Sequence, residues 1–129
     1  MNISNIELVE VPNTRWTVTL SKLYDLSPDT AEEVIGLPDG VTIWDTHFVE
    51  DLFQAEDSTS NHLLDIGWYP GGEADGHFRL VLITKDAGES EYNWRQPVFQ
   101  YETRSVDQLV TKLKNIMSAK DLSDVARDQ

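Results

Sequence analysis

Residues 62–85 read HLLDIGWYPGGEADGHFRLVLITK, two runs rich in Leu, Ile and Val on either side of a glycine-rich segment. Apolar runs of this length, bounded by turn residues, are typical of β-strands. The glycines within 70–76 provide the positive φ angles that a tight reversal of the chain needs. We therefore predict strands at 62–69 and 77–85 that form an antiparallel hairpin.

Three further strands flank this hairpin in the sequence. Apolar and polar residues alternate in 3–11 and again in 15–26, which predicts a strand in each segment. The turn residues at 12–14 indicate that these two strands form a second hairpin. A last strand is predicted at 97–103, so that the strands are grouped in hairpins along the chain.

The clearest helix signal covers 105–117, where apolar residues recur at the i, i+3, i+4 and i+7 positions of one helical face. Ser105 and Gln108 have the spacing of a capping box at the start of this helix. A shorter helix is predicted to begin after Ser27, an N-cap followed by a proline, and to end at Gly36.

Residues 45–56 fit two different structures. Their apolar residues recur with the spacing of one helical face, which favours a helix. Asp45 would cap that helix, and Trp44 would take part in a hydrophobic staple. A strand through Trp44, Thr46 and Phe48 is the alternative, and we predict the helix.

Together these elements predict an α+β fold, an antiparallel sheet of about five strands with two or three helices packed on it. The 129 residues have the size of one domain, and 40% of them are hydrophobic, which is enough for a buried core. We therefore predict a single domain over 1–129. The polar tail 120–129 is expected to fray.

The net charge of −13 is concentrated in one part of the chain. No Lys or Arg occurs from Leu23 to Phe78, whereas this stretch holds thirteen acids, as many as the whole net charge. A surface of one sign repels nucleic acid and anionic membranes and attracts cationic surfaces. Solubility alone is the alternative explanation, but the complete absence of bases favours a basic protein partner, with no nucleic acid and no membrane. The acids are Asp25, Asp29, Glu32, Glu33, Asp39, Asp45, Glu50, Asp51, Glu56, Asp57, Asp65, Glu73 and Asp75.

Few residues in the sequence suggest a catalytic or metal-binding site. The chain has no cysteine, which excludes thiol nucleophiles, disulfides and cysteine zinc sites. His47, His62 and His77 lack the local spacing of a metal site, and no phosphate-binding glycine motif occurs. Asp65 is interpreted as an outward-facing strand residue, although an enzyme that uses it with His62 or His77 is an alternative. We predict no enzyme activity, no catalytic residue, no metal and no cofactor.

The sequence also bears on localisation. The first residues lack the basic and apolar regions of a secretory signal. No apolar run approaches the roughly 20 residues that a helix needs to span a bilayer. Cytoplasmic residence is therefore expected.

Aromatic residues close to acids are candidate contacts for a basic partner. Interfaces concentrate Tyr and Trp at their centre and place charge around them. Tyr69 and Tyr92 are the better candidates, because a phenol tolerates water at one end. Trp68 and Trp94 are equally well explained as closing the end of the core. The predicted partner-binding residues are Glu50, Asp51, Tyr69, Glu73, Asp75 and Tyr92.

Four segments, LDIGWYP at 64–70, GHFRL at 76–80, WRQP at 94–97 and TRSVDQL at 103–109, carry a family resemblance. They resemble immunity proteins of bacterial contact-dependent growth inhibition and related polymorphic toxin systems, over residues 62–117. The resemblance implies an acidic, cytoplasmic and enzymatically inert protein. Such a protein would bind the C-terminal toxin domain of a cognate delivered protein, often a nuclease, and mask its substrate-binding surface. A generic acidic adaptor is the alternative function.

Overall fold

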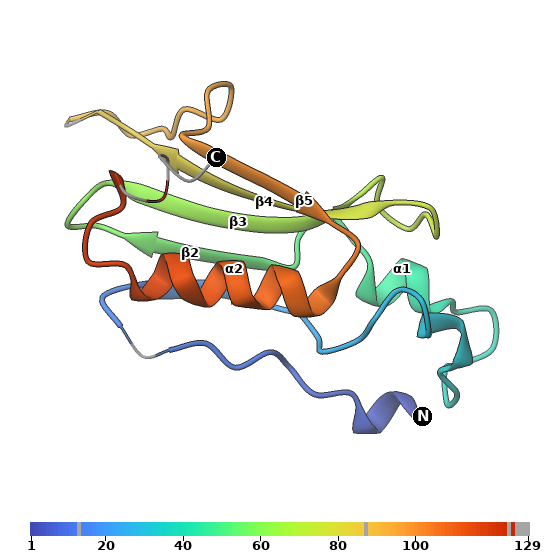
Figure 1. Ribbon diagram of the computed structural model, residues 1–129. Helices are drawn as coiled ribbons and strands as arrows, with labels where there is room; N and C mark the ends of the chain where they lie inside the picture. The colour runs from blue at the N-terminus through green and yellow to red at the C-terminus, as the bar shows by residue number, and fades with distance from the viewer. Residues whose placement is uncertain (13, 87, 124, 126–129) are drawn as a thin grey trace.

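Five strands, each antiparallel to its neighbour, form one sheet in the order of the chain (Figure 1). The computed structural model describes residues 1–12, 14–86, 88–123 and 125. The predicted α+β fold with its antiparallel sheet is confirmed. The strands are β1 (Thr17–Ser21), β2 (Phe53–Asp57), β3 (His62–Tyr69), β4 (His77–Thr84) and β5 (Phe99–Thr103).

The central hairpin of β3 and β4 follows its prediction closely. Tyr69 pairs with His77 next to the turn, and His62 pairs with Thr84 at the far end. This hairpin lies between β2 and β5, and most of its residues are buried, on one face in the core with α2 and on the other in a cluster with Tyr92. A strand covered on both faces reads as a continuous apolar run, which is the pattern of its sequence.

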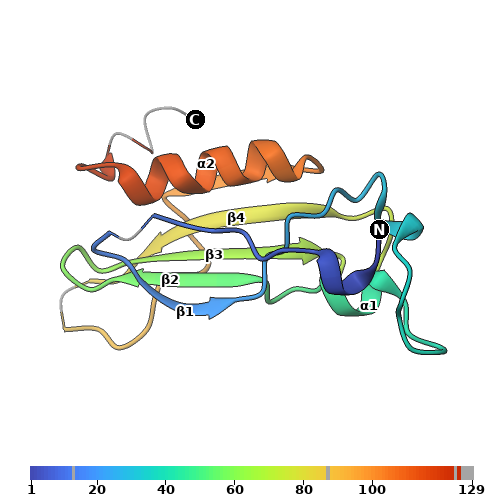
Figure 2. The same cartoon turned by 90° about the horizontal axis from the view of Figure 1, so that it is seen from below.

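The helix α2 (Val106–Ser118) lies along one face of the sheet, with the N-terminal segment beside it (Figures 1 and 2). Apolar side chains from the sheet and from α2 form one core between them. Each large apolar side chain buried in this way contributes about 1.5–3 kcal/mol. Buried members include Phe53, Leu64, Ile66, Leu80, Leu82, Phe99, Leu109, Leu113, Ile116 and Met117.

The N-terminus of α2 forms half of the predicted capping box. The hydroxyl of Ser105 accepts from the amide of Gln108 at 3.2 Å. The reciprocal bond is replaced, because the amide of Ser105 donates to the hydroxyl of Thr103 at 3.0 Å. The side-chain oxygen of Gln108 accepts from that same hydroxyl at 3.2 Å, so the cap also ties α2 to β5.

Aromatic rings close the core at the end of the sheet where α1 (Ile43–His47) lies (Figure 1). The ring of Phe48 is 4.8 Å from Trp68, and Trp68 is 5.0 Å from Phe78, both in edge-to-face geometry. Such pairs add about 0.5–1.5 kcal/mol each beyond the area they bury. The indole nitrogen of Trp68 donates to the carbonyl of Glu73 at 2.7 Å, which fastens the β3–β4 turn to the core.

The predicted N-terminal hairpin is wrong. The segment 3–11 contains a short 3-10 helix, Ile3–Asn5, and a single bridge between Leu8 and Tyr24. The side chain of Asn2 caps that turn by accepting from the amide of Ser4 at 3.0 Å. The segment 15–26 forms only the short strand β1, which pairs with β2 instead. Local capping therefore replaces the extended chain that alternation alone predicted.

The predicted helix after Ser27 is reduced to one 3-10 turn, Ala31–Glu33. The hydroxyl of Ser27 does accept from the amide of Asp29, at 3.2 Å, but regular helix does not follow. The chain is extended again at Val34, and Ile35 forms a parallel bridge with Asn2. Pairing with the N-terminus thus takes the residues that would have continued the helix.

The predicted helix over 45–56 is also wrong, as is its strand alternative. The helix α1 begins earlier, with Thr42 as its cap, whose hydroxyl accepts from the amide of Asp45 at 3.1 Å. The chain then becomes β2 from Phe53 to Asp57. Buried and half-buried residues alternate regularly in β2, but the residues just before it interrupt that alternation.

A β-bulge opposite Gly67 is the cause of this interruption. The amide of Trp68 donates to the carbonyl of Val49 at 2.9 Å. The amide of Leu52 donates to the carbonyl of Ile66 at 3.0 Å. Two residues, Glu50 and Asp51, therefore oppose the single Gly67, the geometry of a bulge. A Cβ atom at position 67 would lie 2.0 Å from the carbonyl oxygen of Glu50. The bulge thus requires glycine at this position.

The described part of the C-terminal tail is attached to the fold. Leu122, expected to lie in a frayed tail, is 6% exposed and belongs to the core. The expectation of fraying at 124 and 126–129 lies outside the described residues.

We predict that Gly67→Ala lowers the free energy of unfolding by more than about 3 kcal/mol, because the new Cβ meets backbone atoms that cannot move without opening the bulge. The matched control is Gly40→Ala. Gly40 has a φ of +78° but nothing within 4 Å of an added Cβ, so its cost is limited to about 1–2 kcal/mol of backbone strain. Urea unfolding of the two variants and the parent measures the difference. Equal losses would contradict the close approach at Gly67.

Candidate functional site

The helix α1 packs against the β3–β4 turn and so joins two acidic parts of the chain. The amide of Gly72 donates to the carbonyl of Phe48 at 2.8 Å. A Cβ added at Gly72 would lie 3.1 Å from Oδ1 of Asp45, and one added at Gly71 would lie 3.1 Å from Cγ of Glu50. Glycines in the turn therefore allow it to contact α1 and the bulge closely.

Nine exposed acids gather at this end of the sheet, which we call the acidic end. They come from the segment 29–51, which includes α1, and from the β3–β4 turn (Figure 1). Arg104 lies beside them, with its guanidinium 3.9 Å from Asp29 and bonded to the carbonyl of Ala74 at 3.1 Å. In the part of the chain that the structure describes, no other ion pair involves these acids. The nine are Asp29, Glu32, Glu33, Asp39, Asp45, Glu50, Asp51, Glu73 and Asp75.

Five of the six predicted partner-binding residues lie in or beside the acidic end. Two acids form the bulge, two lie in the β3–β4 turn, and the tyrosine ends β3. The four acids are exposed, and the tyrosine is half-buried. The five are Glu50, Asp51, Tyr69, Glu73 and Asp75.

Tyr69 is held against the bulge. Its ring covers Gly67, and its hydroxyl donates to the carbonyl of Glu50 at 3.4 Å. The guanidinium carbon of Arg79 lies 4.0 Å from the ring centroid, a cation–π contact. Burial, together with the charge of Asp65, raises the pKa of Tyr69, so the phenol stays a neutral donor. Tyr69 thus presents a fixed aromatic edge next to the acids.

Tyr92 lies apart from these five residues. It packs against Leu63, Val81 and Ile83 on the face of the sheet opposite α2. This cluster lies toward the β2–β3 turn, away from the acidic end, since Leu63 and Ile83 pair near that end of the hairpin. The role of Tyr92 in partner binding stays a prediction. Trp94, for which a place at the end of the core was considered, is 51% exposed.

A small cavity of about 250 Å³ opens within the acidic end, between α1 and the segment 31–37. Leu37, Ile43 and Trp44 supply much of its apolar lining. The indole nitrogen of Trp44 donates to the carboxylate of Glu32 at 3.2 Å, which fixes the ring at the rim. An apolar hollow with an acidic rim can accept an apolar side chain flanked by basic ones.

Asp65 faces away from α2, as the prediction of an outward-facing strand residue requires. It is nevertheless buried, not exposed to solvent. It is 9% exposed, and its Oδ1 accepts from the side-chain amide of Gln54 at 3.3 Å. Burial raises the pKa of Asp65 to about 6, against the opposite effect of the Gln54 hydrogen bond. This burial could not be predicted from the local sequence, because Gln54, which contacts Asp65, belongs to the neighbouring strand β2.

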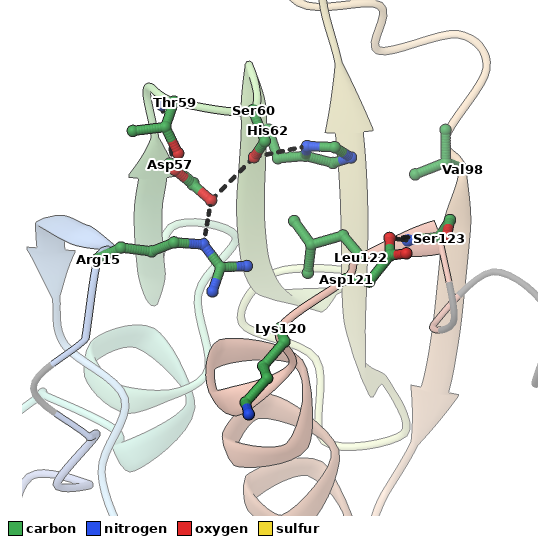
Figure 3. A pocket seen from close by; sticks show the side chains of 10 residues that line it. All are labelled: Arg15, Asp57, Thr59, Ser60, His62, Val98, Lys120, Asp121, Leu122 and Ser123. Carbon is green, nitrogen blue, oxygen red and sulfur yellow. Dashed lines mark hydrogen bonds and ion pairs between the residues drawn. The ribbon is translucent and has the colours of Figure 1, made fainter.

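A larger pocket, of about 620 Å³, lies at the other end of β3, between the β2–β3 turn and the chain that follows α2 (Figure 3). Arg15 enters it from the segment before β1, Asp57 from the end of β2 and His62 from the start of β3. Leu122 and Val98 add apolar surface. The pocket was not predicted from the sequence, because Arg15 and Asp57 are 42 residues apart.

The carboxylate of Asp57 organises this pocket. It is fully buried, and its Oδ1 accepts from the amide and the hydroxyl of Thr59, at 3.1 and 2.6 Å. Its Oδ2 accepts from the hydroxyl of Ser60 at 2.8 Å and from Nε of Arg15 at 2.5 Å. Burial alone would raise the pKa of Asp57, but hydrogen bonds from Thr59, Arg15 and Ser60 together lower it to about 2. An Asp followed at two and three positions by hydroxyl residues is the sequence signal of such a turn.

Ser60 connects Asp57 to His62. The Nδ1 atom of His62 lies 3.0 Å from the Ser60 hydroxyl oxygen. Ser60 has a single proton, which it donates to Asp57, so it accepts from Nδ1 of His62. The serine is therefore not arranged as a nucleophile that a histidine base activates. Burial lowers the pKa of His62, and its Nε2 atom is left for other contacts.

The three histidines do not converge. His62 pairs with Thr84 and His77 pairs with Tyr69, so the two lie at opposite ends of the hairpin. His77 instead lies 3.4 Å from Glu102. Among the residues that the structure describes, no group of three or more His, Asp or Glu side chains could hold a metal ion.

Comparison with known proteins adds no relative. No protein-family model matches the chain, and no curated protein or solved structure is significantly similar to it. Over the described residues, no helix has the length and apolar character to cross a membrane.

We predict that Asp65→Asn raises the free energy of unfolding at pH 7 by about 1–3 kcal/mol. The folded carboxyl group has a pKa of about 6, against 3.8 for an aspartate in water, so folding takes up a proton between these values and stability falls as the pH rises through this window. The gain should shrink as the pH falls below 6 and vanish near pH 3, where both states are largely protonated. Denaturant unfolding between pH 3 and 8 measures it, with the exposed Asp39→Asn as control. A gain that is the same at pH 3 and pH 7 would contradict the buried carboxyl.

Proposed function

We propose that this chain is an immunity protein, which binds and neutralises a basic bacterial toxin domain by covering the surface where its substrate binds. The observation that carries the proposal is the acidic end. The segment 29–51 and the β3–β4 turn bring nine exposed acids together there, with Arg79 and Arg104 beside them. Surface acids placed only for solubility have no need to converge in this way.

The acidic end also has the parts of an interface. Trp44 and its cavity provide an apolar centre, and Tyr69 provides a fixed aromatic edge. Such centres supply most of the binding free energy, whereas surrounding charges steer the partners together. Lys and Arg side chains that contact phosphates in a nuclease would meet Asp and Glu here instead.

The family resemblance of residues 62–117 is the reason for proposing a bacterial toxin domain as the partner. The chain would act in the cytoplasm of a bacterium that is exposed to the delivered toxin, without catalysis and without a cofactor. A generic acidic adaptor would use the same surface, so the two differ in whether the bound protein loses its activity. An enzyme that uses Asp65 with a histidine has less support, because no described hydrogen bond joins Asp65 to His62 or His77.

Capture from a lysate of the source organism, read by mass spectrometry, tests the proposal. The acidic-end variant carries Glu50, Asp51, Glu73 and Asp75 changed to Lys. The matched control carries Glu7, Glu10, Glu89 and Glu91 changed to Lys, which are exposed acids outside the acidic end with the same total change in charge. We expect the parent and the control to retain a basic toxin domain that the acidic-end variant loses.

Growth then separates an immunity protein from an adaptor. Expression of the captured domain should stop bacterial growth, and co-expression of the parent or the control should restore it. The acidic-end variant should fail to restore growth. A captured protein whose activity is unaffected would overturn neutralisation in favour of an adaptor.

We predict that the acidic-end variant associates with the captured domain more slowly than the parent by at least about tenfold at low salt. Most of this difference should disappear at physiological ionic strength and above, where the Debye length is about 8 Å or less. Stopped-flow or surface-binding kinetics measure it. Equal slowing of the matched control would mean that only net charge matters, and no slowing of either variant would assign the acids to solubility.

A further inference from the structure

We propose that the pocket at the β2–β3 turn binds a small amphipathic carboxylate, with its anionic head at Arg15 and His62 and its apolar body along Val98 and Leu122. This site is independent of the proposed function. It lies at the opposite end of β3 from the acidic end and needs no protein partner.

The head group would be recognised by Arg15. Asp57 engages its Nε atom at 2.5 Å, and within the described residues no hydrogen bond engages its two terminal nitrogens. Figure 3 shows the guanidinium between Asp57 and Leu122, at the wall of the pocket. The terminal nitrogens of a guanidinium match the two oxygens of a carboxylate. Because Thr59 and Ser60 also hold Asp57, the guanidinium is fixed before a ligand arrives.

His62 supplies the second polar contact. Its Nδ1 proton is used by Ser60, and its other nitrogen, Nε2, lies on the side of the ring away from Ser60 (Figure 3). When protonated, Nε2 donates to a carboxylate, and when neutral it accepts from a ligand hydroxyl or amide. Arg15 and His62, together with Lys120, thus line the pocket with polar groups of the kind that ligand sites use.

The rest of the pocket sets the size and charge of the ligand. Its volume of about 620 Å³ lies within the range of small-molecule sites. The apolar surface of Val98 and Leu122 suits a hydrocarbon body, which inorganic anions lack. A ligand with several negative charges is disfavoured, because the chain carries a net charge of −13 and the carboxylates of Asp57 and Asp121 already line the pocket.

Octanoate is the probe. Octylammonium has the same hydrocarbon chain with the opposite charge, octanol is uncharged, and inorganic phosphate has no apolar body. Titrations followed by NMR should show saturable binding of octanoate, with shifts at the Arg15 Nε–H group, the His62 ring and the Leu122 methyl groups. The other three compounds should bind at least about tenfold more weakly. Equal binding of octanol and octanoate would overturn recognition by Arg15 and His62.

Val98→Glu places a negative charge at the pocket and should weaken octanoate binding at least about tenfold. Its matched control is Val18→Glu on β1, since Val98 and Val18 are 36% and 39% exposed. The control should bind octanoate like the parent, within about twofold. Equal weakening in both variants would overturn the location. If Val98→Glu does not fold, the shifts in the parent decide the location, and shifts confined to residues outside the pocket overturn it.

Discussion

The carbonyl oxygen of Glu50 lies where a side chain at position 67 would begin, and much of the molecule depends on this close approach. It allows two residues to bulge out opposite Gly67 while the β2–β3 pairing continues beyond them. The bulge turns the chain so that Phe48 and α1 lie against the end of the core. It also places Glu50 and Asp51 beside Tyr69 and the β3–β4 turn. A backbone contact of one glycine thus links the core to the acidic end.

The parts of the fold that could be predicted are those that local pattern determines. The runs that became β3 and β4 are buried on both faces, and α2 has one continuous apolar face, so their signals are strong. The segments 3–11 and 45–56 could not be predicted in this way. Asn2 and Thr42 cap short turns there, and the bulge shifts the alternation just before β2. Competing local hydrogen bonds and an extra residue in a strand do not change composition, so periodicity does not reveal them.

The two candidate sites also differ in how far local sequence predicts them. The acidic end could be predicted in part, because all nine of its acids belong to the one stretch of sequence without Lys or Arg. The pocket at the other end could not, because Arg15 and Asp57 are 42 residues apart in the sequence. The environment of Asp65 could not be predicted for a related reason, since Gln54, which contacts it, belongs to another strand. Charge runs along a chain are visible in a sequence, whereas long-range pairs need the sheet register.

The sequential order of the strands has a consequence for biosynthesis. Short connections join β2 to β3 and β3 to β4, whereas the connection from β1 to β2 spans 22–52. The entropy that is lost on closing a loop grows with its length. During translation β1 emerges first and stays unpaired until β2 has been made, with the acid-rich connection extended behind it. Like charges on these connections repel one another, which opposes association between neighbouring nascent chains while β1 is unpaired.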